Sequence, residues 1–256
     1  IDGDRIFILN DNEENSFIAA FDKKTGDELW RVDRDEKSSW STPFLWHNSM
    51  RTELVTCATK RVRSYDPATG ELIWELGGMS VICSPTPIAG DDLLYISSGY
   101  VMDSKRPLFA IRPGSSGDIT LEGDETSSAG VAWCQKLAGP YIPSPVLVGD
   151  QIYVLYDRGF FASFDAKTGK PTYEKQRIEP GSGGFTASPW AYDGKIFCLN
   201  EDGDTFVIQA GPEFKVLGKN SLDELFMASP AISSNLLILR GMNYLYCIEN
   251  QAKSAR

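Results

Sequence analysis

The sequence predicts an all-β fold: a β-propeller of four-stranded antiparallel blades, with about six blade units represented. The first observation is a phrase of the type aromatic-Asp-x-x-Thr-Gly, followed four residues later by Trp or Tyr, at residues 21–30, 65–74 and 164–173. The second is a small residue before proline, at Thr42-Pro43, Ser84-Pro85, Ser144-Pro145, Ser188-Pro189 and Ser229-Pro230. These prolines are 42, 60, 44 and 41 residues apart. A period in the low forties, built from short β-type runs, is typical of propeller blades.

The clearest unit runs from Ile142 to Tyr173 and contains four strand-like runs. Pro145 begins a short first strand, because proline has no N–H to donate to a sheet. The second run, 151–156, alternates and is rich in β-branched and aromatic residues. The third run, 160–164, leads into an Asp-x-x-Thr-Gly turn whose glycine can adopt positive φ. The fourth run carries Tyr173, in the position that tryptophan occupies in the other copies.

A four-stranded meander cannot bury both of its faces alone, so such units are expected to stack side by side. Trp30, Trp74 and Trp133 suit the contact between neighbouring units. A tryptophan there fills a large flat space and can donate its N–H to a backbone carbonyl. We therefore predict a structural role for these three residues.

The units cover residues 1–256 without a linker or a change of composition, which indicates a single domain. The first unit ends near Val32 and lacks the Ser-Pro strand, and the sixth starts at Ser229 and stops after Ile248. The two ends do not complete one blade between them. We therefore expect an N-terminally incomplete part of a seven- or eight-bladed propeller.

Composition excludes several classes of function. The formal net charge of −10 argues against nucleic acid as a partner and against anionic membrane surfaces. No apolar run approaches the length of about 18 residues that a membrane span needs, so we expect no membrane insertion. The five cysteines are scattered and form no Cys-x-x-Cys, which favours buried thiols over disulfides or zinc. With His47 as the one histidine, a Ser-His-Asp or Cys-His site is not expected, nor is a cofactor.

The Asp-x-x-Thr-Gly-x-x-x-Trp turn, together with the Ser-Pro strand, resembles the pyrroloquinoline-quinone-like propeller repeat. Quinoprotein alcohol dehydrogenases share this repeat with the propeller lipoprotein of the outer-membrane β-barrel assembly machinery. The resemblance implies a bacterial protein outside the cytoplasm, periplasmic or secreted. It specifies the fold far more closely than the function.

The resemblance leaves an enzyme as one alternative. The dehydrogenases of this family carry two adjacent cysteines over the quinone and a calcium ion held near an Asp base. This sequence has no adjacent cysteines and no Cys-x-x-Cys-His. We therefore expect a non-catalytic binding or scaffolding propeller. A quinone-dependent oxidoreductase and a sensor or accessory domain of a larger polypeptide are the alternatives.

Two kinds of loop lie on the same face of a propeller: those that lead from one unit into the next, and those that join a unit's second and third strands. We call this side the loop face. The candidate binding residues on it are Trp40, Lys60, Arg61, Tyr100, Lys105, Arg106, Tyr141, Arg158, Phe185 and Arg240. Aromatic and cationic side chains at the mouth of a central channel suit a protein segment or a cell-surface polymer. The alternative is that these residues rim a water-filled channel and bind no specific ligand. The sequence does not indicate an oligomeric state.

One unit is longer than the others by some 18 residues. Part of the excess extends the loop 99–107 on the loop face, and the rest falls in 113–129 on the opposite face. Insertions into repeats often mark the working face. We expect the longer insertion, rich in Gly, Ser, Asp and Glu, to be a solvated flap. The acidic stretches 10–15 and 200–204 fit turns better than calcium loops.

Overall fold

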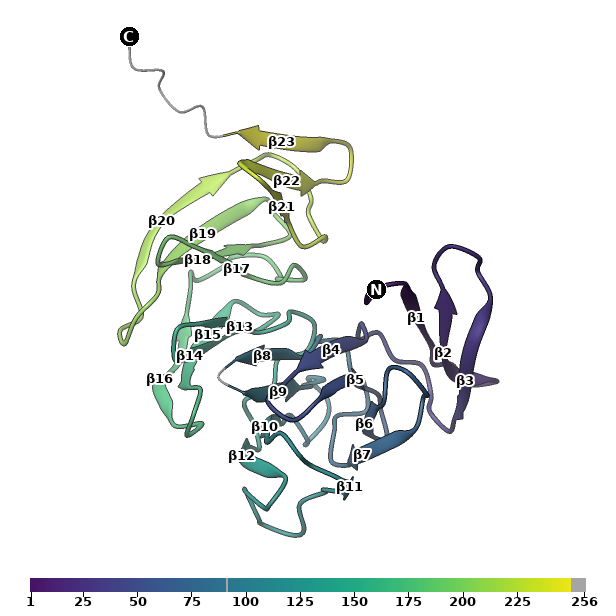
Figure 1. The fold of residues 1–256 in the computed structure, drawn as a ribbon. Helices are drawn as coiled ribbons and strands as arrows, with labels where there is room; N and C mark the ends of the chain where they lie inside the picture. Colours follow the sequence, from purple (N-terminus) through teal and green to yellow (C-terminus); the bar gives the residue numbers. More distant parts are fainter. Residues whose placement is uncertain (91, 250–256) are drawn as a thin grey trace.

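The computed structural model describes residues 1–90 and 92–249, and this part of the chain is built from strands, turns and loops without helices. The strands form six sheets. Figure 1 shows the sheets following one another in chain order around an arc, with β1 near one end and β23 at the other. The all-β propeller architecture predicted from the repeats is confirmed.

The strands have the following bounds. The first sheet contains β1 (Arg5–Asn10), β2 (Ser16–Asp22) and β3 (Glu28–Arg34). The second contains β4 (Phe44–His47), β5 (Thr52–Thr56), β6 (Val62–Tyr65), β7 (Leu72–Leu76) and, at its edge, β11 (Gly117–Asp118). The third contains β8 (Ile88–Gly90), β9 (Leu93–Ser97), β10 (Leu108–Ile111) and β12 (Val131–Gln135).

The fourth sheet contains β13 (Val146–Val148), β14 (Gln151–Leu155), β15 (Phe160–Asp165) and β16 (Pro171–Arg177). The fifth contains β17 (Trp190–Tyr192), β18 (Lys195–Leu199), β19 (Asp204–Gln209) and β20 (Val216–Ser221). The sixth contains β21 (Ala231–Ser233), β22 (Leu236–Arg240) and β23 (Leu245–Glu249). Apart from β11, strands that neighbour one another in a sheet pair antiparallel, as the meander predicts.

The repeat predicts that Pro85 opens the third unit. In the structure Pro87 opens it instead. Pro87 stands directly before β8, as Pro145 stands directly before β13. The backbone N–H of Thr86, and not of Ser84, makes the contact with Ser144 that its counterparts make in later units. Two adjacent small-residue–proline pairs occur here, and the sequence does not distinguish them. With Pro87 in place of Pro85, the proline spacings become 44, 58, 44 and 41 residues.

The core lies between neighbouring sheets. Side chains such as Trp46, Trp74, Ile96 and Phe109 fill the space between the second and third sheets, and similar clusters follow around the arc. Four of the five cysteines are buried, as predicted, but Cys247 is exposed on β23. Its position in the outer strand of the sixth sheet explains the difference, since no further described sheet covers it.

The repeated tryptophan joins one sheet to the next. Trp30 Nε1 donates to the carbonyl oxygen of Pro67 at 3.2 Å, and Trp133 Nε1 donates to that of Ala166 at 3.0 Å. Both acceptors lie in the Asp-x-x-Thr-Gly turn of the following unit. The predicted use of the indole N–H on a backbone carbonyl is therefore confirmed for these two tryptophans.

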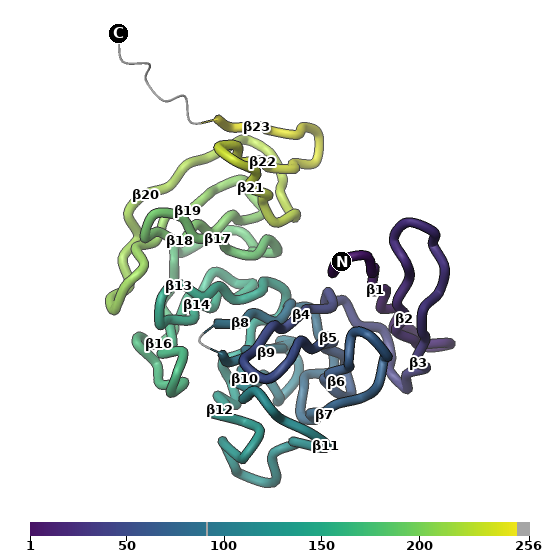
Figure 2. Tube along the Cα trace, in the orientation of Figure 1, coloured from purple at the N-terminus to yellow at the C-terminus, as the bar shows by residue number. Residues whose placement is uncertain are grey.

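Trp74 makes a different contact because the unit after it has no Asp-x-x-Thr-Gly turn. Residues 112–130 replace that turn, and they carry β11 alongside β7 (Figure 2). The two strands pair parallel, with Gly117 opposite Trp74. The Trp74 indole N–H instead donates to Glu53 Oε2 at 2.6 Å. The insertion is thus attached to the neighbouring sheet at β11, whereas residues 122–129 are exposed, as expected for a solvated flap.

Candidate functional site

A cavity of about 480 Å³ opens where the loops between successive sheets converge. Its lining residues are Trp40, Ile82, Ser84, Thr86, Tyr141, Ile142, Ser144, Thr186, Ser188 and Ser229. They come from five connections, one from each sheet into the next. The predicted loop face therefore brings two of its candidate residues, Trp40 and Tyr141, into one site.

A chain of hydrogen bonds holds this cavity's wall together. The backbone N–H of Thr86 donates to Ser144 Oγ, that of Ser144 to Ser188 Oγ, and that of Ser188 to Ser229 Oγ, each at 2.9 Å. The Ser-Pro motif is explained by this chain, because each serine accepts from the sheet before it while its proline starts the strand. Among the described residues no acceptor is found for the O–H groups of these three serines, which can therefore donate to a bound ligand.

The lining chemistry is neutral. Indole, phenol, hydroxyl and aliphatic groups make up the wall, and none of its side chains is a carboxylate, imidazole, thiol or amine. Trp40 is 61% exposed, an unusual position for the largest apolar side chain. An exposed tryptophan beside hydroxyl donors can bind an apolar side chain together with backbone carbonyls.

The loop that carries Tyr100 is fixed against the same site. The rings of Tyr100 and Tyr141 lie 5.1 Å apart between centroids. Asp103 accepts from the Val81 N–H at 2.7 Å and from the Ser80 hydroxyl at 3.1 Å. Burial opposes ionisation of Asp103, but these contacts and the Lys105 N–H outweigh it and lower the pKa of this carboxyl. The extended loop therefore adds Tyr100 to the rim of the cavity.

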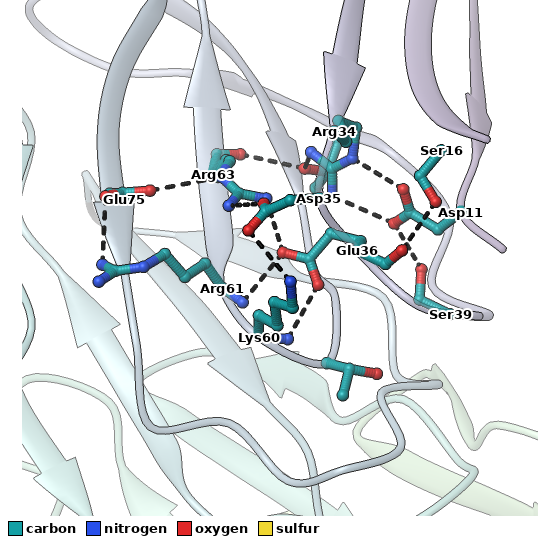
Figure 3. Close-up of polar contacts among 12 residues, drawn as sticks. Asp11, Ser16, Arg34, Asp35, Glu36, Ser39, Lys60, Arg61, Arg63 and Glu75 are labelled. Atoms are coloured by element: carbon teal, nitrogen blue, oxygen red, sulfur yellow. Dashed lines mark hydrogen bonds and ion pairs between the residues drawn. The ribbon is translucent and has the colours of Figure 1, made fainter. Parts of the chain in front are cut away.

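Lys60 and Arg61 lie in ion pairs, Lys60 with the segment after the first sheet and Arg61 within the second sheet (Figure 3). The Lys60 ammonium is 3.1 Å from Asp35, and the Arg61 guanidinium is 2.8 Å from Asp118 and 3.3 Å from Glu75. Asp35 is exposed, and its pair with Lys60 lowers its pKa. Both cations therefore already have partners within the chain.

The buried Glu36 side chain binds three members of this network. Its carboxylate accepts from the backbone N–H groups of Lys60 and Arg61 and pairs with Arg63 at 2.6 Å, although its side chain is fully buried. Burial opposes the charge on Arg63, but Glu36 and Asp35 outweigh this effect and raise its pKa. The network thus fixes the loop between β5 and β6 by buried, charge-assisted hydrogen bonds.

A second buried pair lies beside it. Arg34 and Asp11 meet at 2.8 Å with side chains that are 1% and 0% exposed. Arg34 also donates to Thr56 at 3.0 Å and to the Tyr65 hydroxyl at 2.5 Å. Sequence reasoning missed this pair and Glu36, and the signal that could have found them was the charge run Asp33-Arg34-Asp35-Glu36 at a position where a propeller needs buried residues.

The remaining candidates are dispersed. Phe185 is fully buried against Phe206, with ring centroids 6.0 Å apart, so it belongs to the core and not to a binding surface. Arg158 and Arg240 are exposed but do not line the cavity. Lys105 lines a separate hollow of about 550 Å³ beside the insertion. Arg106 is partly buried and lies next to it in the chain.

No group of three or more His, Cys, Asp or Glu side chains suited to a metal occurs in the described residues. The stretches 10–15 and 200–204 form turns: Asn12 Oδ1 accepts from two backbone N–H groups, and the Asp204 N–H donates to Asn200 Oδ1 at 2.7 Å. Over residues 1–90 and 92–249, no helix has the length and apolar character to cross a membrane.

Solved structures with the same fold were found by comparison. BamB from Moraxella catarrhalis matches with a TM-score of 0.70 and 14% sequence identity, over 96% of this chain and 69% of that one. Quinohemoprotein alcohol dehydrogenase from Comamonas testosteroni matches with a TM-score of 0.61 and 13% identity, over 86% of this chain and 42% of that one. At these identities the likeness concerns the fold alone. No curated protein sequence matches the chain.

The fold and the family repeat together define a β-propeller of the pyrroloquinoline-quinone-like class. A sequence profile described as "Outer membrane protein assembly factor BamB" matches residues 13–111 and 58–212, which is most of the chain. The protein belongs to this family, as the repeat resemblance predicted.

Proposed function

We propose that this protein is a non-catalytic binding propeller that acts outside the cytoplasm and holds a segment of a partner protein at the central cavity. The observation that carries the proposal is the cavity wall, where Trp40 and Tyr141 stand beside serine hydroxyls with free donors. Such a wall can bind a polypeptide by packing and hydrogen bonding. The wall holds no carboxylate, imidazole, thiol or amine beside its hydroxyl groups that could act as the base which activates a nucleophile.

Family membership supports the location and the kind of partner. The family takes its description from an outer-membrane protein assembly factor. A periplasmic propeller that contacts other proteins fits that description. A cell-surface polymer is the second candidate partner, since neighbouring aromatic rings such as Tyr100 and Tyr141 also suit sugars.

The residues of the cavity do not fit a quinone cofactor. Its lining provides no carboxylate for a calcium ion and no cysteine to stack on a quinone ring. Cys57 and Cys83, the cysteines of the neighbouring loops, are fully buried and separated in sequence. We therefore derive no quinone chemistry for this chain, despite the shared fold with a quinohemoprotein.

Site-specific photocrosslinking tests the proposal. A photoreactive phenylalanine analogue would replace Trp40 or Tyr141 in cells that express the full protein, and crosslinked products would be identified by mass spectrometry. The matched control is Tyr192, which is 70% exposed and stands at the far end of β17, next to the turn at Asp193. We expect the same defined protein adduct from positions 40 and 141 and none from position 192.

Two results would contradict the proposal. Equal adducts from all three positions would show contact without a preferred surface. Adducts at position 192 alone would place the binding surface on the opposite face. Crosslinking to glycan in place of protein would support the cavity but replace the partner class.

A further inference from the structure

Two cations near the outer part of the loop face have no anionic partner among the described residues. The Arg106 Nε atom is buried and makes no hydrogen bond, and no carboxylate lies within ion-pair distance of its guanidinium. Lys175, on β16, also forms no ion pair, and its ammonium lies 4.0 Å from the centroid of the Tyr156 ring. Buried donors without partners are rare in folded proteins, so the Arg106 Nε atom requires an explanation.

The loop between β12 and β13 contacts both Arg106 and the ring that lies against Lys175. The Arg106 carbonyl accepts from the Gly139 N–H at 2.7 Å, which fixes Arg106 against the loop between β12 and β13. The Tyr156 hydroxyl donates to the carbonyl oxygen of Ala138 at 2.9 Å, which fixes the ring beneath Lys175 against the neighbouring residue of the same loop. Tyr141 of the central cavity follows two residues after Gly139.

The electrostatic surroundings leave the pair short of negative charge. Although Lys175 is exposed overall, partial burial of its ammonium lowers its pKa, and the positive charge of Arg106 lowers it further. The nearby carboxylates of Asp157 and Glu174 oppose this effect without reversing it. Asp157 also faces Arg158, whose Nε lies 4.0 Å from its carboxylate. On a chain of net charge −10, this is a local excess of cations.

We propose that Arg106 and Lys175 form a docking site for a carboxylate side chain of an acidic protein segment that continues along the β12–β13 loop to the cavity at Tyr141. The proposal rests on the proposed function, because it concerns the same partner. A guanidinium whose terminal N–H groups have no partner in the described part of the chain, together with a neighbouring ammonium, suits a carboxylate, which the Arg fork can bind through two parallel N–H donors. Segment binding also explains why the site shares a loop with the cavity.

Binding of a labelled, acetylated hexaglutamate peptide to the full chain tests this site. We expect Arg106→Gln and Lys175→Gln each to weaken binding about tenfold, the usual loss for one charge-assisted contact. The matched control is Lys215→Gln, which removes the same charge from an exposed position directly before β20 of another sheet. It is expected to leave the affinity unchanged. Equal weakening by all three variants would mean that only net charge matters and would overturn the proposal.

A second measurement does not depend on the variants being fully folded. In the unaltered protein, NMR titration of the Lys175 ammonium should show its pKa rising when hexaglutamate binds, because a carboxylate stabilises the charged form. No change at Lys175 would contradict the proposal. Displacement of the peptide by inorganic phosphate at the same concentration would also contradict it, since the site would then take any small anion.

The two proposals fail separately. Loss of crosslinking at Trp40 with intact peptide binding at Arg106 would reject the cavity and keep the cation pair. Crosslinking at Trp40 with no effect of Arg106→Gln on peptide binding would keep the cavity and reject the cation pair.

Discussion

The indole ring of Trp133 covers Gly169 so closely that a Cβ atom at this glycine would lie 2.5 Å from the ring. Trp30 covers Gly70 in the same way, at 2.7 Å. In both cases φ of the glycine is positive, at 69° and 77°. The glycine of the repeated turn is therefore needed for two reasons. The turn requires its positive φ, and the tryptophan of the preceding sheet leaves no room for a Cβ atom.

Replacement of Gly169 by alanine should separate these two requirements. A left-handed conformation costs alanine about 1–2 kcal/mol, and displacing a packed ring costs about 1–3 kcal/mol more. Gly26 is the matched control, since it has φ of 79° in the equivalent turn and a Cβ atom there would meet nothing within 4 Å. We expect Gly169→Ala to lose about 3 kcal/mol of unfolding free energy in urea and Gly26→Ala about 1 kcal/mol. Equal losses would show that the ring contact is unimportant.

The buried carboxylate of Glu53 replaces the missing turn at Trp74. It accepts from the Trp74 indole at 2.6 Å, from the Ser64 hydroxyl at 2.6 Å and from Arg51 at 3.0 Å. Asn48 Nδ2 is a fourth donor, at 3.1 Å. Glu53→Ala should lower the free energy of unfolding by about 3–5 kcal/mol, because four donors lose a buried acceptor. Glu28→Ala, which breaks only an exposed pair with Arg31, should cost far less than Glu53→Ala, because solvent screens exposed ion pairs. Similar losses for the two would refute the role given to Glu53.

The repeat predicted the strand order because each strand is specified locally, by alternation and turn residues. It did not predict β11, because a parallel pairing of Gly117 with Trp74 depends on a contact 43 residues away in sequence. The prediction of Pro85 in place of Pro87 was wrong for a similar reason. Only the contact with Ser144, in another unit, distinguishes Thr86-Pro87 from Ser84-Pro85.

The Arg34–Asp11 pair should show strong coupling. Either single replacement, Arg34→Met or Asp11→Leu, leaves an unpaired buried charge and should cost about 3–5 kcal/mol. The double variant should lose clearly less than the sum of the two, since no charge is then stranded. Additive losses in urea denaturation would contradict the view that the two side chains act as a pair.

Stability should fall at acidic pH partly through Asp103. The folded-state pKa of Asp103 is lowered below its ordinary value of 3.8, so its contribution is present above that pH and is lost as the pH falls through the lower folded value. Asp103→Asn should therefore flatten the dependence of unfolding free energy on pH below about pH 4. The control variant is Glu71→Gln, which removes an exposed carboxylate. An unchanged slope in Asp103→Asn would contradict this assignment.

Sequence reasoning identified the loop face but could not tell which of its side chains were free. Lys60 and Arg61 bind Asp35 and Glu36, which follow β3 of the first sheet, and Asp118, which is in the insertion 57 residues after Arg61. Phe185 follows a Gly-Gly pair and was predicted at the rim, yet its ring fills the space under Gly159. Tyr141 reaches the cavity because its loop ends at Ser144 of the serine chain. Trp40 reaches it because its N–H donates to the Cys83 carbonyl oxygen at 3.0 Å, a contact that the repeat does not reveal.

The central claim is that this propeller binds and does not catalyse. The most direct test is thermal unfolding of the purified chain with and without pyrroloquinoline quinone and calcium, together with an absorption spectrum. A ligand at 100 times its Kd adds about 2.7 kcal/mol, or roughly 5–10 °C in a domain of this size. We predict no shift and no bound chromophore. A shift of that size with a quinone spectrum would contradict the account and restore the oxidoreductase.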